Sequence, residues 1–451
     1  MKKKLLYMFA LVATATVFTG CKDQPDKYEV ADGTPTVNYI RQLSTEITTS
    51  TTTEDTHFTN GEFVTSASPQ ALLCLVGENL RSVYEMYFND QKAVLNSSYI
   101  TDNTLIVQVP RTVPKTVSNK IYMITEGGDT VTYDFQVVIS APTVNSMSCE
   151  YAAAGTTATL SGAYFINDTN VPLTITFPNG KTAEIKEIDE TYSSVKFVVP
   201  ECDESGPITV TSIYGTTETK FYYKDDRGLM FDFDGVTGLT NRGWHDRVIT
   251  TDDNAITGNY LQLGNGETTM SADGGWNDSQ FSFEYWPGDW TDPVTYPANG
   301  VRLFDLVDFS DYKNMAIKFE MCIPSEYAWK AGAMQIIMAP TSAVSMGNAG
   351  TDEYGNTVAG CNNSYFQGDD LPRALYRPWT ETGSFDTGGE WITVSIPIAT
   401  SFIYGMNGGS ATGSLSQESF ASLVIFVVAG GISGTECTPL FKIDNIRAVP
   451  Y

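Results

Sequence analysis

Positively charged residues are scarce in this chain. Its 451 residues carry 27 lysines and arginines against 53 aspartates and glutamates, which gives a formal net charge of −26. No basic stripe that could neutralise a phosphate backbone follows the first few residues. Nucleic acid is therefore excluded as an expected partner. Among polysaccharides the composition favours neutral ones, because the field of such a protein repels polyanions.

Histidine is rarer still, and cysteine is thinly spread. With only His57 and His245, a histidine-dependent triad has very few possible bases, and neither lies in a nucleophile-elbow motif. No CxxC spacing occurs, which favours buried free thiols and leaves disulfides open, at Cys74, Cys149, Cys202, Cys322, Cys361 and Cys437. The segment Asp232–Gly235 lacks the other ligands of a calcium loop and is interpreted as a strand with outward aspartates. We expect neither a metal nor a cofactor.

No run of about 18 apolar residues, the length that spans a bilayer, occurs beyond the N-terminus. There, three lysines precede the short apolar run Leu5–Phe18, which has the layout of a secretory signal. Gly20-Cys21 then resembles a lipobox, in which the Cys21 thiol is lipidated and residues 1–20 are removed; an ordinary signal peptide or a short anchor helix is the alternative. Residues 21–33 resemble the tether of surface lipoproteins. We expect a lipid-anchored protein of an outer membrane that faces the cell exterior.

One tetrapeptide occurs twice, as Pro35-Thr36-Val37-Asn38 and Pro142-Thr143-Val144-Asn145. Each copy is followed by an apolar strand that reaches a glycine, Gly77 or Gly162, and later by a strand that closes on Pro110 or Pro200. The order is the same in both halves, so a duplicated module is the economical interpretation. Alternating apolar residues and turn signals predict antiparallel strands packed as a two-sheet sandwich.

These motifs resemble the IPT/TIG family of immunoglobulin-like domains, whose pattern is a proline-led strand, a Gly-x-Asn-Phe-like turn and a strand that ends in Val-Pro. The resemblance implies one such domain at residues 34–140 and a second at residues 141–226, both acting as spacers. The first copy carries a threonine-rich insertion around Thr48–Thr53. We expect this insertion to form a loop or a flexible entry segment.

Tryptophan is absent before residue 228. All seven tryptophans lie beyond that point, at Trp244, Trp276, Trp286, Trp290, Trp329, Trp379 and Trp391. This region is strand-rich, and no helix of 10 to 12 residues with a convincing apolar stripe interrupts it. We predict a larger, jelly-roll-like β-sandwich over residues 227–451, and an all-β chain whose length suits about three domains.

Several of these tryptophans stand in glycine- and proline-rich settings typical of binding loops. A protein that binds polysaccharide needs exposed aromatic planes beside hydrogen-bonding groups, and large apolar surfaces are otherwise kept from water. The predicted glycan-contacting residues are Tyr285, Trp286, Trp290, Trp244, Trp276, Trp329, Trp379, Asp289 and Asn299. The alternative is that these rings cap the hydrophobic core, and we assign Trp391, which starts an alternating strand, to the core.

The order of these features resembles the surface glycan-binding proteins of starch-utilisation-type outer-membrane uptake systems, with a xyloglucan-binding type of C-terminal domain. The lipobox, the tandem modules, the Tyr285-Trp286 pair and the ending Phe441–Arg447 carry the resemblance. It implies non-catalytic capture of a neutral β-glucan such as xyloglucan, mixed-linkage glucan or laminarin, beside a transporter and glycosidases. Because family members stack aromatic rings on β-glucan backbones, it points first to Tyr285 and Trp286.

Two other classes of function stay open. A glycoside hydrolase needs only a suitably spaced carboxylate pair, and the C-terminal region offers many carboxylates, among them Asp232, Asp234, Glu284 and Asp289. A structural or adhesive surface protein would need only the immunoglobulin-like repeats, although the clustering of tryptophan argues against it.

Overall fold

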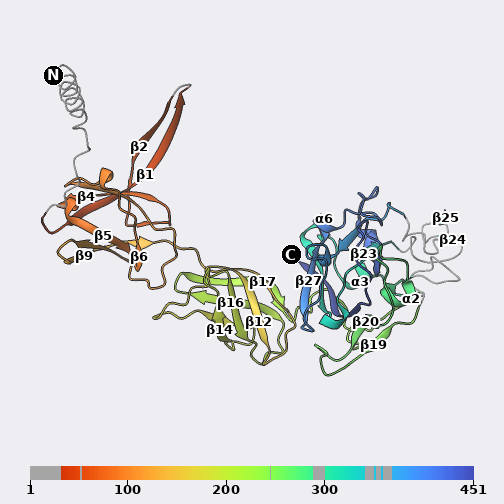
Figure 1. The fold of residues 1–451 in the computed structure, drawn as a ribbon. Coiled ribbons are helices and arrows are strands. Elements are labelled where there is room, and N and C mark those ends of the chain that lie inside the picture. Colours follow the sequence, from red (N-terminus) through yellow and green to blue (C-terminus); the bar gives the residue numbers. More distant parts are fainter. Residues whose placement is uncertain are drawn as a thin grey trace, which may run out of the picture. The chain divides into compact units, whose positions relative to one another are not determined.

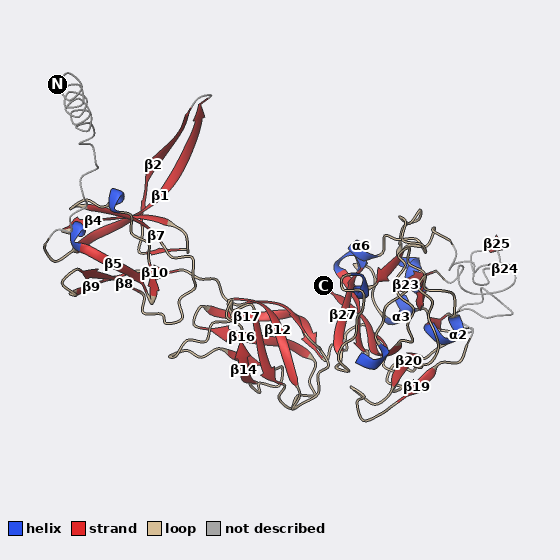
Figure 2. Cartoon of the chain, viewed as in Figure 1, coloured by secondary structure: helices blue, strands red, loops and turns tan. Residues whose placement is uncertain are grey.

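The computed structural model describes residues 32–50, 53–243, 245–287, 300–340, 350–351, 357–358 and 368–451, without the side chains of 45–50, 53–60, 350–351 and 357–358. The regular structure is almost entirely strand (Figure 2), and the described α-helices are single turns: α2 (Asp278–Phe281), α3 (Leu303–Leu306) and α6 (Ile398–Ser401). Two compact units are present. One comprises the chain up to Ser140 with Asn167–Val171, and the other comprises Ala141–Ile166 with Pro172–Tyr451.

The first unit is a β-sandwich. One sheet has the order β2-β1-β4-β7, the other has the order β6-β5-β8-β9, and a short parallel pair joins β10 to β3. The strands are β1 (Thr36–Ser50), β2 (Thr53–Phe63), β3 (Ser66–Ala67), β4 (Leu72–Glu78), β5 (Val83–Phe88), β6 (Gln91–Lys92), β7 (Thr104–Gln108), β8 (Lys120–Thr125), β9 (Thr130–Asp134) and β10 (Gln136–Val137), with 3-10 turns η1 (Leu80–Ser82) and η2 (Ser97–Tyr99).

The threonine-rich insertion is not a loop. Its backbone pairs in β1 and β2 as far as Ser50 opposite Thr53, so the expectation of a loop was wrong. Threonine is β-branched and favours extended backbone. The result is a hairpin that extends well beyond the partner strand β4 (Figure 1), which pairs with β1 only from Thr36 to Leu43.

The second sandwich begins the other unit. Its sheets have the orders β11-β12-β15-β14 and β13-β16-β17. The strands are β11 (Thr143–Met147), β12 (Thr157–Ala163), β13 (Thr174–Thr176), β14 (Glu184–Ile188), β15 (Ser194–Val198), β16 (Gly206–Ser212) and β17 (Gly215–Tyr223). Alternate residues of β16 are buried, as expected where one face of a strand packs on a core.

The two sandwiches repeat the same local geometry at the repeated sequence. The register of β1 shifts between Val37 and Tyr39, and that of β11 shifts between Val144 and Ser146, so each copy has a β-bulge at the asparagine of Pro-Thr-Val-Asn. The glycine opposite each bulge has no room for a side chain. A Cβ on Gly77 would lie 1.8 Å from the Thr36 carbonyl oxygen, and a Cβ on Gly162 would lie 1.8 Å from the Thr143 carbonyl oxygen. The repeated motif thus corresponds to the same β-bulge opposite a glycine in both sandwiches.

The C-terminal sandwich also has two sheets. The six-stranded sheet runs β19-β20-β29-β22-β27 with β18 paired to β29, and the four-stranded sheet runs β21-β28-β23-β26, while β24 and β25 pair only with each other. The strands are β18 (Leu229–Phe231), β19 (Val248–Thr250), β20 (Tyr260–Gly264), β21 (Ser282–Tyr285), β22 (Met315–Cys322), β23 (Ala333–Ala339), β24 (Gly350–Thr351), β25 (Thr357–Val358), β26 (Arg373–Tyr376), β27 (Ile392–Pro397), β28 (Ser422–Val428) and β29 (Leu440–Pro450), with 3-10 turns η3 (Tyr312–Asn314), η4 (Ser325–Tyr327), η5 (Pro378–Thr380) and η6 (Gln417–Ala421). Every residue of β22, β23 and β28 is buried, so both sheet faces are covered.

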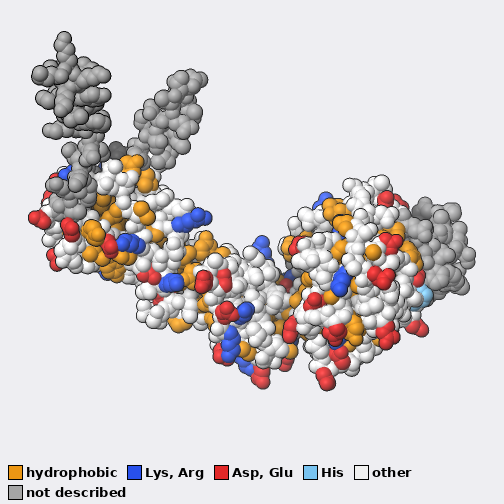
Figure 3. Space-filling model, viewed as in Figure 1, with side chains coloured by type: hydrophobic (Ala, Val, Ile, Leu, Met, Phe, Trp, Pro, Cys, Tyr) orange, Lys and Arg blue, Asp and Glu red, His pale blue; other side chains and the backbone are white. Residues whose placement is uncertain are grey.

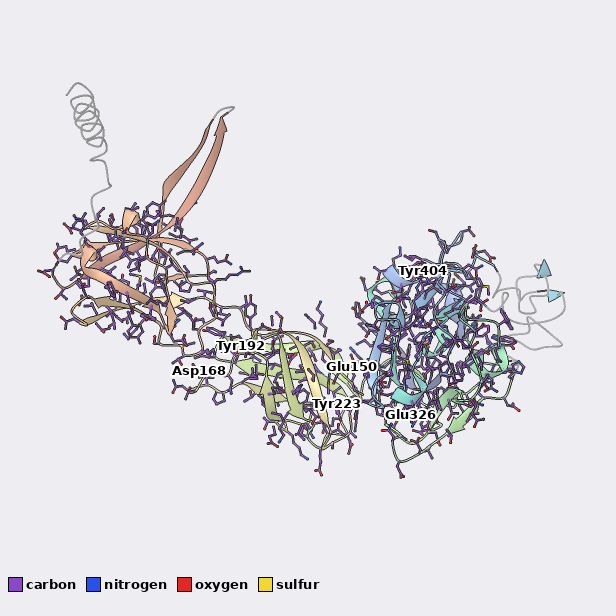
Figure 4. The ribbon with its side chains drawn as sticks, viewed as in Figure 1. Glu150, Asp168, Tyr192, Tyr223, Glu326 and Tyr404 are labelled. Atoms are coloured by element: carbon purple, nitrogen blue, oxygen red, sulfur yellow. The ribbon has the colours of Figure 1, made fainter. Side chains whose placement is uncertain are left out.

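A buried ionic network joins the second sandwich to the C-terminal one. Glu150 (labelled in Figure 4) accepts hydrogen bonds from Lys318 at 2.6 Å and from Arg447 at 2.8 Å. Arg447 also donates to Glu320, and Thr393 links the Glu150 backbone N–H to the Glu320 carboxylate. We name this set the junction network. Trp391, which the sequence assigned to the core, is half-buried and packs against the core of the second sandwich.

The described cysteines are free thiols, as favoured from the sequence. Cys149, Cys202, Cys322 and Cys437 are buried, and Cys74 is half-buried. Acidic side chains are spread over the face drawn in Figure 3 rather than gathered in one patch. Among the described residues, no helix is long and apolar enough to span a bilayer.

Candidate glycan-binding site

Three tryptophan-bearing segments of the C-terminal sandwich converge on strand β21. The backbone of Arg242 runs beside this strand, donating from its N–H to the Glu284 carbonyl at 2.8 Å and accepting from the Trp286 N–H at 2.9 Å. Gly243 passes so close that a Cβ there would lie 2.4 Å from the Glu284 Cβ. The glycine before Trp244 is therefore required by packing against the strand.

The segment that contains Trp276 reaches the same place. His245 Nε2 lies 3.6 Å from a carboxylate oxygen of Asp278, and Arg247 donates to the Ser279 carbonyl at 3.3 Å. The Arg242 guanidinium donates to the Pro287 carbonyl at 3.0 Å. The segments around residues 244, 276 and 286, distant in sequence, are therefore neighbours in the fold.

A buried polar cluster holds these segments together. Arg247 pairs with Glu284 at 2.8 Å, and their side chains are 3% and 1% exposed. Ser282 accepts from Arg247 at 2.6 Å, and its hydroxyl oxygen lies within hydrogen-bonding distance of both Glu284 and the Asp278 carbonyl, which share its single proton. Charge-assisted bonds of this kind, made in a site of low dielectric, fix geometry strongly. We name Arg247, Glu284 and Ser282 the anchoring cluster.

Trp276 presents an indole to water. Its side chain is 42% exposed, and its ring packs edge-on against Phe426 with centroids 4.9 Å apart. Phe426 lies directly opposite Ser282 in the register of β28 and β21, so Trp276 stands close to the anchoring cluster. An exposed aromatic plane supported from beneath by a buried ring, with polar groups at its side, suits the flat apolar face of a sugar.

Tyr285 and Trp286, the first choices from the sequence, are not exposed. Tyr285 is 3% exposed, packs against Phe231 at 5.3 Å, and donates its hydroxyl to the Val301 carbonyl at 2.7 Å. Trp286 is 9% exposed and belongs to the same hydrophobic core. The physical reason is the period of two in a strand, which places Tyr285 on the core face with Phe283. The expectation that this pair forms an open platform was wrong.

Trp329 and Trp379 are also core residues. Trp329 is fully buried and donates its indole N–H to the Ala331 carbonyl at 2.6 Å, while Trp379 is 3% exposed and donates to the Gly332 carbonyl at 2.7 Å. Buried tryptophans usually find such a backbone acceptor. Their predicted contact with glycan is therefore contradicted by their burial.

The remaining predicted residues lie outside the described residues. These are Cys21, Trp244, Asp289, Trp290 and Asn299. Their roles stay predictions. For Trp244 the adjacent residues Gly243 and His245 are described, and Pro287 is the last described residue before the segment that holds Trp290.

The described carboxylates considered for hydrolysis serve the fold. Asp232 is 4% exposed and accepts from the Val236 N–H at 2.8 Å, so the expectation of an outward side chain was wrong for Asp232, whereas Asp234 is exposed as expected. The segment follows the end of β18 and does not form a strand. Asp234 accepts from the Asn259 backbone N–H at 2.6 Å, and Glu284 belongs to the anchoring cluster. Within the described part of the chain, no group of three or more His, Cys, Asp or Glu is placed to hold a metal.

Sequence reasoning missed the anchoring cluster and the ring beneath Trp276. Arg247 stands three residues after Trp244, and this proximity to a candidate tryptophan is a signal that could have found it. Phe426 gave no such signal, since it stands within an unbroken apolar strand, and only the strand register places it under Trp276.

Comparison with known proteins identifies the class. Residues 223–450 match the profile described as the surface glycan-binding protein B xyloglucan binding domain. The crystal structure of the surface glycan-binding protein PbSGBP-B from Prevotella bryantii is 46% identical, covers 93% of this chain and 99% of its own, and has a TM-score of 0.80. An IPT/TIG domain-containing protein of Bacteroides ovatus is 25% identical over 233 residues, which is 48% of this chain and 44% of that protein.

The fold and these likenesses define a cell-surface, non-catalytic, glycan-binding protein built from β-sandwiches. The chain belongs to the family of surface glycan-binding proteins B. It spans less than half the length of the curated Bacteroides relative that it matches.

Proposed function

We propose that the C-terminal sandwich binds a neutral β-glucan, with xyloglucan, mixed-linkage glucan and laminarin as the candidates. The observation that carries this proposal is the convergence of three tryptophan-bearing segments on β21, with the Trp276 ring exposed beside the anchoring cluster. The matched family, described by its xyloglucan-binding domain, supports xyloglucan first.

Several aromatic contacts must act together. One stacked ring contributes about 0.5–1.5 kcal/mol beyond its buried area, whereas micromolar affinity needs roughly 8 kcal/mol. Trp276 therefore needs partners, and Trp244 and Trp290 are the proposed ones, with Asp289 and Asn299 as hydrogen-bonding neighbours. The ligand is then an extended oligosaccharide lying across several subsites.

The rest of the chain serves to present this site. In the proposal, Cys21 is lipidated in the outer membrane, residues 21–33 form a tether, and the sandwiches at residues 34–140 and 141–226 act as spacers. Capture at the surface would raise the local concentration of glycan for a neighbouring transporter and for glycosidases.

Calorimetry tests the proposal directly. The chain from Lys22 onward is titrated with xyloglucan, mixed-linkage glucan and laminarin, and Trp276→Ala is expected to weaken binding about tenfold, the upper end for a stacked ring with its apolar area. Tyr84→Ala is the control, since Tyr84 is 59% exposed on the first sandwich. Heat from none of the three glycans, or equal effects of the two variants, would contradict the proposal.

A further inference from the structure

A cavity separate from the tryptophan segments lies between the second sandwich and the C-terminal one. Its volume is about 420 Å³, and its walls come from β11, β17, β22, β27 and the end of β29. Sites for small ligands commonly have volumes of roughly 300–1,000 Å³ and lie between domains. Both walls belong to the same compact unit, residues 141–166 with 172–451.

The junction network gives this cavity a rigid floor. Glu150 and Lys318 both line it, and their side chains are 3% and 5% exposed. Among the described residues, the Lys318 ammonium makes one hydrogen bond, to Glu150 at 2.6 Å. An ammonium has three N–H donors. Lys318 therefore has donors left for a hydroxyl group in the cavity.

The walls combine apolar rings with hydroxyls. Phe221 and Tyr451 contribute rings, and Tyr451 is 63% exposed. Ser146 and Ser395 contribute hydroxyls from opposite walls, one on β11 and one on β27. A pyranose needs this combination, because its C–H face packs on an aromatic ring while its hydroxyls need donors and acceptors.

We propose that this junction cavity is an accessory subsite for a short neutral oligosaccharide, in which one sugar ring lies against Tyr451 and its hydroxyls reach Lys318, Ser146 and Ser395. This inference rests on the proposed function, since the ligand is the same class of glycan. Among the described lining residues, Glu150 and Lys318 neutralise each other as a buried ion pair, and Lys220 adds one further cation. An ammonium group donates hydrogen bonds to sugar hydroxyls as well as to carboxylates, so the test below compares the neutral oligosaccharide with an oligogalacturonide.

The test counts bound oligosaccharides. Native mass spectrometry and calorimetry are applied to the chain from Lys22 onward with a xylogluco-oligosaccharide, first as wild type and then with Trp276→Ala. We expect two binding events in the wild type, of which Trp276→Ala removes or weakens the tighter one and leaves the weaker one. Adding Tyr451→Ala is expected to weaken that second event about three- to tenfold, and Ser146→Trp, which fills the cavity from its exposed rim, to abolish it.

The outcomes separate the two proposals. A Trp276-sensitive event with no second event, or a second event that neither Tyr451→Ala nor Ser146→Trp changes, overturns the accessory subsite and leaves the proposed function standing. No Trp276-sensitive event overturns the proposed function. Binding of an oligogalacturonide in place of the neutral oligosaccharide, lost in Ser146→Trp, overturns the assignment to a neutral glycan. If Ser146→Trp does not fold, the Tyr451→Ala result decides, because that ring is mostly in water already.

Discussion

At the scale of the residue, the sequence shows where the tryptophans cluster along the chain but not which of their rings are exposed. Their clustering after residue 228 pointed to the region that matches the xyloglucan binding domain profile. Which rings are exposed depends on details that composition does not contain. Trp329 is fully buried with the Ala331 carbonyl as acceptor for its N–H, whereas Trp276 packs edge-on against Phe426 of β28 and keeps part of its surface in water.

Truncation of Trp329 should therefore affect stability. Trp329→Ala is expected to lower the free energy of unfolding by about 3–5 kcal/mol, the range for deleting a large buried aromatic side chain. Urea denaturation measures it. Trp276→Ala is the matched comparison, with a smaller loss expected because 42% of that side chain is already in water. Equal losses in the two variants would show that Trp329 is not the better-packed ring.

Asp444 gives a prediction about pH. Burial raises the pKa of Asp444 to about 8, although Thr257 and the Asn445 backbone N–H donate to its carboxylate. The folded pKa lies above the unfolded one, near 4, so the folded state binds more protons between these values. The contribution of this group to stability is complete below about pH 4 and is lost as the pH rises toward 8.

An asparagine at this position should remove that dependence. Asp444→Asn keeps the shape of the neutral carboxyl, so its stability relative to wild type is expected to increase from pH 5 to pH 8, by at most about 4 kcal/mol for one proton. Denaturant unfolding at the two pH values measures the change. A constant difference between variant and wild type would mean that Asp444 is ionised throughout.

At the scale of the element, short patterns predicted strands well where one face is buried. The alternation around residues 195–199 and the repeated Pro-Thr-Val-Asn both correspond to strands of the structure, in β15 and in β1 and β11. The long hairpin of β1 and β2 was missed, because a threonine-rich run has no apolar periodicity. Its two halves, the end of β1 and the start of β2, pair with each other. Polar composition alone does not distinguish a loop from a two-stranded hairpin that is exposed to solvent.

The duplicated bulge predicts matched effects in the two sandwiches. Gly77→Ala and Gly162→Ala each place a methyl group 1.8 Å from a threonine carbonyl oxygen, so the strands must separate. We expect each to cost about 1–3 kcal/mol, as for overpacked sites. The control is Gly127→Ala, where the nearest atom, the Thr125 hydroxyl oxygen, would be 3.8 Å away. Thermal unfolding compares the three, and a neutral Gly77→Ala or Gly162→Ala would mean that the bulge relaxes freely.

At the scale of the whole molecule, the sequence suggested a series of separate domains. In the structure, the second sandwich and the C-terminal sandwich belong to one compact unit. Glu150 and Arg447 are 297 positions apart in the sequence, and no local sequence pattern predicts their contact. Burial raises the pKa of Glu320 in spite of the Arg447 guanidinium beside it, which shows how thoroughly the junction network is removed from water. Such networks confer little stability when complete, yet breaking one is costly because it leaves a buried charge uncompensated.

Glu150→Gln is therefore expected to act on two domains at once. The variant keeps the size of the side chain but leaves Lys318 and Arg447 without one of their carboxylates, so we expect a loss of about 3–5 kcal/mol. Differential scanning calorimetry should also show the transition of residues 141–451 separating into two, because the second and C-terminal sandwiches no longer unfold together. Glu184→Gln, which breaks an exposed pair with Lys186 on the second sandwich, should cost less than about 1 kcal/mol and leave one transition. If both variants behaved alike, the junction would be an ordinary surface contact, and the rigid floor required by the accessory subsite would be missing.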